Sequence, residues 1–316
     1  MTENRPETRV ERPLAILSLD GGGAKGFYTL GVLKELEAML GRPLWQAFDI
    51  IYGTSTGAII ASLLALGRSV PEIRKLYEEH VPAVMRHWLP SRRSRALEQL
   101  SLEVFKDARF TDMKTYVGIV ATHWGNERPL IFKSSVSQAH GRKATFEAGL
   151  GCSVGDAVRA SCSAYPFFKR TTVQTPNGAV EAGDGGFCAN NPALFAIADA
   201  VAAFGRIPHD LRVVSVGVGV YPAPTGVNLG WLVRRWPGAQ LLQKVLSINT
   251  LSMEGLNGIL YRQVPTVRIN EKFERPELAT DFLEHDLAKL SVLFQQGCES
   301  FAAKELQLRQ LFGLNS

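Results

Sequence analysis

Cysteine is scarce and scattered in this 316-residue chain. The four cysteines form no C-x-x-C pair, and no histidine stands at metal-ligand spacing from them. This excludes the usual zinc-binding patterns and a disulfide-stapled scaffold. We therefore expect a reducing compartment, packing roles for the thiols and no metal site. The cysteines are Cys152, Cys162, Cys188 and Cys298.

Long apolar runs are also missing. No stretch approaches the ~20 apolar residues that span a bilayer. The N-terminal MTENRPETRVERP lacks the apolar core of a signal peptide, and we expect residues 1–12 to be a disordered lead-in. The sequence predicts a cytoplasmic protein that meets a membrane only peripherally. Its net charge of +5 suits an anionic partner, but a solvated basic surface explains it equally well.

Two strand–turn–helix units follow one another near the N-terminus. LAILSL (14–19) reads as a buried strand, DGGGAKG (20–26) as a turn and FYTLGVLKELEAML (27–40) as a helix. FDIIYG and GTSTG repeat the strand and turn, and an apolar helix at 58–66 completes the second unit. This order predicts an α/β fold with three α/β/α layers around a mostly parallel sheet.

The rest of the chain fits one compact domain over residues 13–316, mainly helical from about 223. We expect the long segment 281–312 to be one amphipathic helix, or a pair that breaks around Gly297. We expect the helix over 155–168 to end near Pro166. The other predicted elements are helices within 71–112 and strands at 115–124, 129–135, 211–220 and 265–270.

The second turn carries the first candidate catalytic residue. Gly53-Thr54-Ser55-Thr56-Gly57 matches G-x-S-x-G, in which a serine stands on a sharp strand-to-helix turn. Glycines two positions to either side relieve crowding, and the following helix points its positive end at the hydroxyl. We predict Ser55 to be a nucleophile; the alternative is an ordinary turn serine that caps a helix.

The first turn offers backbone amides. In a parallel sheet both turns lie beyond the same strand ends, so the amides of Gly22, Gly23 and Ala24 can face an oxyanion formed at Ser55. Gly21, Gly23 and Gly26 of this turn also fit G-x-G-x-x-G, the dinucleotide fingerprint. Against that reading, the loop opens with Asp20, G-x-x-x-x-G-K-[ST] is absent, and no acidic residue ends the second strand.

A serine nucleophile needs a base, and no histidine has a suitable setting. His123, after a strand, is the least unsuitable of the six. Asp184 in EAGDGGFCANNPA is the better candidate, because a glycine-rich turn allows close approach. A carboxylate in a partly apolar site acts as a general base when its pKa is raised. The alternative for Asp184 is a plain turn residue.

Together, DGGGAKG, GTSTG and Asp184-Gly185-Gly186 resemble the patatin-like phospholipase family, and RASCSAYPFF (159–168) resembles the segment before its aspartate turn. The resemblance covers roughly residues 14–200. It implies a Ser55–Asp184 dyad without histidine, an oxyanion hole in the glycine loop and no cofactor or metal. It also implies that acyl esters of membrane phospholipids are the substrates. Lys25 takes a position that is lysine or arginine in the family.

The short chain also resembles the phospholipase effectors of CBASS-type antiphage systems. That resemblance implies a cyclic oligonucleotide activator, peripheral action at the inner membrane and no nucleic acid polymer as partner. It leaves open whether the protein forms a homo-oligomer. A constitutive lysophospholipase or general esterase is the main alternative, and a non-catalytic nucleotide- or lipid-binding module is another.

The basic stretch 86–95 around Trp88 is either a lipid contact or a solvated edge. Phe167 and Phe168 line an acyl path or pack in the core.

Overall fold

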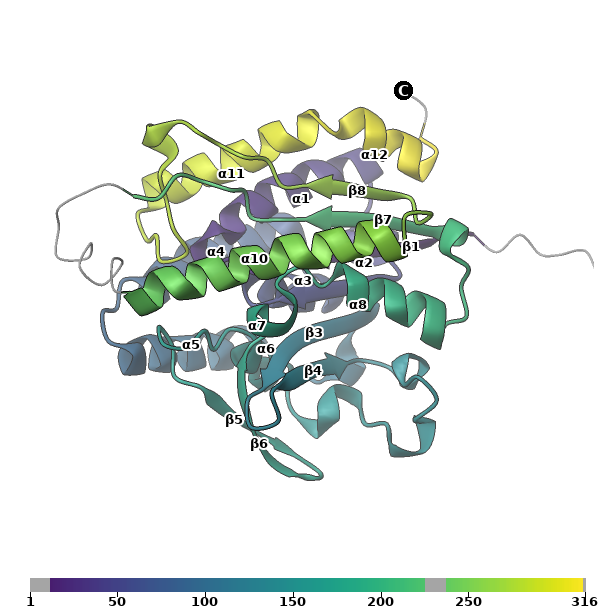
Figure 1. Ribbon diagram of the computed structural model, residues 1–316, viewed down its shortest axis with the longest axis horizontal. Helices are drawn as coiled ribbons and strands as arrows, with labels where there is room; N and C mark the ends of the chain where they lie inside the picture. Colours follow the sequence, from purple (N-terminus) through teal and green to yellow (C-terminus); the bar gives the residue numbers. More distant parts are fainter. Residues whose placement is uncertain (1–11, 225–236, 315–316) are drawn as a thin grey trace, which may run out of the picture.

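An eight-stranded sheet organises the molecule (Figure 1). The computed structural model describes residues 12–224 and 237–314. The strands are β1 (Leu14–Leu19), β2 (Ile50–Thr54), β3 (Tyr116–His123), β4 (Arg128–Lys133), β5 (Thr171–Thr175), β6 (Gly178–Asp184), β7 (Leu211–Val216) and β8 (Thr266–Ile269). Their order is β5-β6-β3-β2-β1-β7-β8, and β4 pairs with β3. Strands β3, β2, β1, β7 and β8 run parallel, whereas β4, β5 and β6 join antiparallel.

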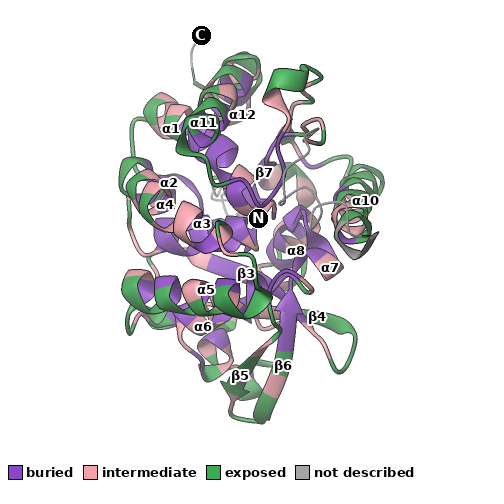
Figure 2. Ribbon diagram, turned by 90° about the vertical axis from the view of Figure 1, so that its left-hand side faces the viewer, coloured by how far each residue is buried: buried purple, intermediate pink, exposed green. Residues whose placement is uncertain are grey.

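Helices cover both faces of the sheet, because its central strands are apolar on both sides. In β1, Leu14 and Ile16 pack into one core, while Leu17 and Leu19 pack into the other. Figure 2 shows these buried strands between the outer helices. The larger core lies under α1 (Gly26–Leu40), α2 (Leu44–Ala47), α3 (Thr56–Ala65), α4 (Val70–Met85), α5 (Pro90–Phe105), α6 (Val154–Ser161), α11 (Leu287–Ala302) and α12 (Glu305–Phe312). The smaller core lies under α7 (Gly186–Ala189), α8 (Ala193–Ala198) and α10 (Pro237–Leu260).

This arrangement confirms the predicted three-layer α/β/α fold with a mostly parallel sheet. Both strand–turn–helix units form as expected, and their turns meet beyond the ends of β1 and β2, which pair in parallel. Sequence signals also explain where helices start. At α4, Ser69 accepts from the Glu72 N–H and Glu72 reaches back to the Ser69 N–H, a capping box, with Pro71 in the first turn.

Two expectations about the elements were wrong, and one element was missed. Helix α6 ends at Ser161, five residues before Pro166, and turns carry the chain onward from there. The hairpin of β5 and β6 was not foreseen, because its residues are mostly polar and half exposed. The long C-terminal helix breaks at residues 303–304, not at Gly297.

Gly297 instead marks a close helix crossing inside α11. A Cβ at Gly297 would stand 2.0 Å from the Tyr28 carbonyl oxygen of α1, and a Cβ at Gly31 would stand 2.0 Å from the Phe294 carbonyl. The two glycines let the backbones of α1 and α11 approach each other. A glycine in a helical pattern therefore reflects packing here, not a break.

The predicted disordered lead-in, residues 1–12, lies outside the described residues except for Arg12. Arg234 and Arg235, whose adjacent charges make them candidate anion contacts in the sequence, also lie outside them. Among the helices of the described ranges, none combines the length and apolarity that crossing a membrane requires.

Candidate active site

Ser55 stands on a strained turn between β2 and α3. Its backbone has φ 53° and ψ −121°, a region that non-glycine residues rarely adopt. The flanking glycines are sterically required. A Cβ at Gly53 would stand 2.3 Å from the Gly57 carbonyl oxygen, and one at Gly57 would stand 2.3 Å from that of Leu19. The turn thus presents the serine hydroxyl to a cleft, which is the geometry of a nucleophile elbow.

A second serine, Ser161, supports this turn through a hydrogen bond to its backbone. The Ser55 N–H donates to the Ser161 hydroxyl at 2.8 Å, and the Ser161 hydroxyl donates to the Val120 carbonyl at 2.5 Å. Ser161 ends α6 and is fully buried. It lies within RASCSAYPFF, but no local pattern indicates this supporting role, because the contact joins residues 106 positions apart.

Asp184 is the last residue of β6, and its side chain enters the same cleft. Its N–H donates to the Ser163 carbonyl, and its own carbonyl accepts from the Thr122 hydroxyl at 2.7 Å. The carboxylate accepts from the Gly186 N–H at 2.7 Å. A Cβ at Gly185 would stand 2.0 Å from the Val120 carbonyl oxygen, so the turn after Asp184 fits against β3 only without a side chain.

Burial gives Asp184 the pKa of a base that works near neutrality. The side chain is 2% exposed, and this desolvation raises its pKa from 3.8 to about 6. The Gly186 N–H and the nearby Ser55 hydroxyl act in the opposite direction. A carboxylate with a raised pKa that lies beside a serine hydroxyl is equipped to accept its proton.

The glycine loop lies beside this pair. Gly22 and Gly23 line the cleft with Ser55, and Gly21 is held by a hydrogen bond from its N–H to the Asn190 carbonyl. Gly23 has φ 59°, a conformation that favours glycine. Ala24 differs from the prediction: it is buried, and its N–H donates to the Phe282 carbonyl at 3.0 Å. Ala24 therefore does not offer a free donor to the cleft in this structure.

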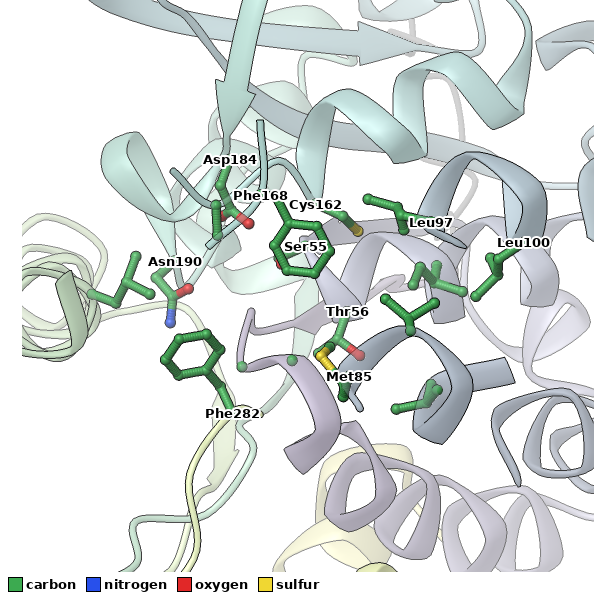
Figure 3. A pocket seen from close by; sticks show the side chains of 17 residues that line it. Ser55, Thr56, Met85, Leu97, Leu100, Cys162, Phe168, Asp184, Asn190 and Phe282 are labelled. Atoms are coloured by element: carbon green, nitrogen blue, oxygen red, sulfur yellow. The ribbon is translucent and has the colours of Figure 1, made fainter. Parts of the chain in front are cut away.

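The cleft itself is mainly apolar (Figure 3). Ser55, Asp184 and Asn190 lie toward one end, and Leu97 and Leu100 of α5 lie at the other. Its empty space is about 640 Å³. The apolar wall is formed by Ile59, Val81, Val84, Met85, Leu97, Leu100, Ala164, Phe168, Leu246 and Phe282. This shape suits an acyl chain whose ester group rests at Ser55.

Other candidates lie outside this arrangement or stay inert in it. His123 is the last residue of β3, where its ring interacts with Asn126 of the following turn, and no histidine is among the described residues that line the cleft. Cys162 is in the cleft wall, but burial and the Asp184 charge raise the pKa of its thiol well above 9. A protonated thiol is a poor nucleophile.

A family model described as patatin-like phospholipase matches residues 17–197, which include all three motifs. The chain belongs to this family. The match confirms the resemblance on the motifs, and it places Ser55, Asp184 and the glycine loop in the segment shared by the patatin-like phospholipases.

Similar proteins extend this match over almost the whole chain. The "cUMP-AMP-activated phospholipase" of Escherichia coli is 58% identical over 93% of this chain and 92% of its own length. The "cGAMP-activated phospholipase" of Pseudomonas aeruginosa (strain BWHPSA011 / Pa011) is 29% identical over 76% of this chain and 73% of its own. The solved structure of VipD from Legionella pneumophila is 12% identical, with a TM-score of 0.48; it aligns with 93% of this chain, which spans 66% of VipD.

The basic stretch at 86–95 divides into two parts. Arg93 is 3% exposed and donates to the carbonyls of Phe167 and His87, so it is a structural residue and not an anion contact. Trp88 and Leu89 are 51% and 53% exposed between α4 and α5. Phe167 and Phe168 are buried, and Phe168 also lines the cleft.

Proposed function

We propose that this patatin-like phospholipase cleaves acyl esters of membrane phospholipids with a Ser55–Asp184 dyad and is switched on by a cyclic dinucleotide. The observation that carries the catalytic part is the strained Ser55 beside a buried carboxylate with a pKa of about 6, at one end of an apolar cleft. The 58% identity to a cUMP-AMP-activated phospholipase supports the activator.

The reaction needs only these groups. Ser55 Oγ attacks the ester carbonyl carbon while Asp184 takes its proton, and the N–H groups of Gly22 and Gly23 stabilise the resulting oxyanion. As the carbon–oxygen ester bond breaks, Asp184 returns the proton to the leaving alcohol of the lysophospholipid. Water then attacks the acyl-enzyme, gives one proton to Asp184 and releases the fatty acid, and that proton returns to Ser55 Oγ.

The exposed corner at Trp88 and Leu89 supports action at a membrane surface. Arg92 and Arg95 are also exposed, on the first two turns of the adjoining helix α5. An indole and a leucine beside two cations suit the headgroup region of an anionic bilayer. We propose that the protein acts in the cytoplasm and binds the inner membrane peripherally at this corner.

The test is hydrolysis of phosphatidylglycerol vesicles with and without cUMP-AMP. We expect fatty acid release that rises at least tenfold with cUMP-AMP and disappears in Ser55→Ala. Equal rates with and without cUMP-AMP, cGAMP and cyclic di-AMP would contradict the activator and favour a constitutive lipase or general esterase. Full activity in Ser55→Ala would contradict the dyad.

The pH dependence of the wild type gives an independent prediction. Asp184 acts as a base only when ionised, and its pKa is raised to about 6. We therefore expect kcat/KM on a soluble short-chain ester to fall about tenfold per pH unit below pH 6 and to level off above pH 7. A rate that stays flat between pH 5 and pH 7 would show that Asp184 is not the base.

A further inference from the structure

A second cavity lies on the other side of the glycine loop from the acyl cleft. Its empty space is about 1030 Å³, part of which opens to solvent. It is lined by the loop, the segment 218–224 after β7, helix α10 and residues 280–282. Gly22, Asn190, Leu246 and Phe282 line both spaces, so they form the partition between them. The catalytic reaction described above does not use this cavity.

Two hydroxyl groups in its wall are buried without a partner. In the part of the chain that the structure describes, neither Thr280 Oγ1 nor the Tyr221 hydroxyl has a hydrogen bond. Thr280 is only 6% exposed. Buried polar groups in native proteins are nearly always paired, and each exception requires an explanation. Both side chains line the cavity, where a polar ligand would supply the missing partners.

A cation faces the same space. Lys25 lines the cavity, and its ammonium group makes no ion pair or hydrogen bond with residues 12–224 or 237–314. Burial lowers the pKa of Lys25, while the charges of Asp281 and Asp20 oppose that shift through space. A phosphate oxygen in the cavity would favour the charged form and give the ammonium a direct partner.

The remaining polar wall suits nucleobases. Gln243 and Ser247 of α10 bring an amide and a hydroxyl, which donate to and accept from base edges. The Tyr221 ring stacks on Phe273 at 4.9 Å with an interplanar angle of 16°, and this packing holds the Tyr221 side chain in the cavity wall. Hydrogen bonds to base edges are one way in which proteins recognise unpaired bases.

We propose that this second cavity is the binding site of the cyclic dinucleotide activator. Lys25 meets a phosphate, and the hydroxyls of Thr280 and Tyr221 bind polar atoms of the sugar–phosphate ring or a base. The proposal rests on the proposed function, because it assigns a place to the activator named there.

The partition explains how this site communicates with the dyad. Phe282 follows Thr280 and Asp281 in the cavity wall, and its carbonyl accepts from the Ala24 N–H. A Cβ at Gly23 would stand 2.4 Å from that carbonyl oxygen, so the two segments are in close contact. The Phe282 ring also packs edge-to-face on Phe167 at 4.8 Å. A ligand that shifts residues 280–282 therefore moves the loop that supplies the oxyanion donors.

The double variant Tyr221→Phe/Thr280→Val tests this site, in a Ser55→Ala background that prevents turnover. Titration calorimetry with cUMP-AMP should show a Kd at least tenfold weaker than in Ser55→Ala alone, because two hydrogen bonds to the ligand are lost. Without ligand, the melting temperature should stay equal or rise, since the substitutions remove two unpaired buried hydroxyls. The matched control Tyr116→Phe/Thr145→Val, away from the cavity, should bind normally.

The other outcomes of these binding experiments distinguish a wrong binding site from a wrong activator. An unchanged Kd in the double variant would overturn the assigned site and leave activation standing. If Ser55→Ala protein binds none of cUMP-AMP, cGAMP and cyclic di-AMP, the activator itself is refuted and the site with it, while ester hydrolysis stands on its own test. An unchanged Kd with a raised KM for vesicles in the Ser55-containing double variant would assign the cavity to the lipid headgroup and overturn the proposal.

Discussion

Asp184→Asn is expected to lower kcat/KM by about 10²–10⁴-fold while making the protein more stable at pH 8. The loss of activity follows because an amide cannot accept the Ser55 proton. The gain in stability follows because the buried carboxylate is costly to ionise. A neutral side chain of the same shape avoids that cost.

The sign of the stability effect depends on pH. The folded protein holds the Asp184 proton more tightly than the unfolded chain, since the pKa is about 6 in the fold against an ordinary value of 3.8. Wild-type stability therefore falls as pH rises from about 4 to 6. The cost reaches at most about 3 kcal/mol above that range. Lost hydrogen bonds offset part of it, and we expect Asp184→Asn to gain about 1–3 kcal/mol at pH 8 and little at pH 4.

Urea unfolding at pH 4 and pH 8 measures this effect. Asp107→Asn, at an exposed carboxylate, is the matched control and should change neither activity nor stability by a measurable amount. If Asp184→Asn lost activity and also destabilised the fold at pH 8, the side chain would be structural. If it kept activity while His123→Ala lost it, the base would be a histidine.

Arg268→Met is expected to destabilise the fold by about 3–5 kcal/mol at neutral pH, because it leaves Asp20 buried without its counter-ion. Arg268 on β8 binds both Asp20 carboxylate oxygens, at 2.9 and 2.6 Å, and also contacts the Ser215 hydroxyl and Glu254 of α10. Asp20 is 2% exposed and begins the glycine loop. The ion pair therefore anchors this loop to the sheet.

The defect should grow with pH. Burial already raises the pKa of Asp20 against the opposing effect of Arg268, and removal of the guanidinium raises it further. A carboxyl with a raised folded-state pKa costs stability once pH exceeds its unfolded value, so Arg268→Met should be least harmful near pH 4.

Chemical denaturation at several pH values tests this prediction. Arg68→Met, which removes an exposed pair with Glu72, is the control and should cost about 0.5 kcal/mol or less. Asp20→Asn/Arg268→Met should recover much of the loss. It also keeps the test informative if the single variant does not fold. A loss below 1 kcal/mol in Arg268→Met, unchanged by pH, would show that the pair does not hold the loop.

The sequence predicts the elements and turns correctly where a local residue pattern coincides with a position that sterically requires glycine. Strand β1 and helix α1 follow from apolar runs, and the turns around Ser55 follow from glycines whose positions tolerate no Cβ. Asp184 was singled out as a candidate base by its glycine-rich surroundings. Its place at the end of β6, in an antiparallel hairpin, was missed because the polar residues of 171–181 carry no clear strand period.

Contacts between segments far apart in the chain could not be predicted from the sequence. The Ala24 N–H bonds to the Phe282 carbonyl, 258 positions away along the chain. Ser161 supports Ser55 across 106 positions, and Arg268 neutralises Asp20 across 248 positions. Gly297 looked like a helix break because its partner, the backbone of α1 at Tyr28, is invisible in the local sequence. The tertiary fold alone brings these groups together.

Mass spectrometry of the protein after reaction with a long-chain fluorophosphonate tests the central claim most directly. The reagent forms a covalent bond to an activated serine and places its alkyl chain where an acyl chain binds. We predict one adduct, on Ser55, that is absent in Ser55→Ala and strongly slowed in Asp184→Asn. An adduct on another residue, or equally fast labelling of Ser55 without Asp184, would contradict the proposed dyad.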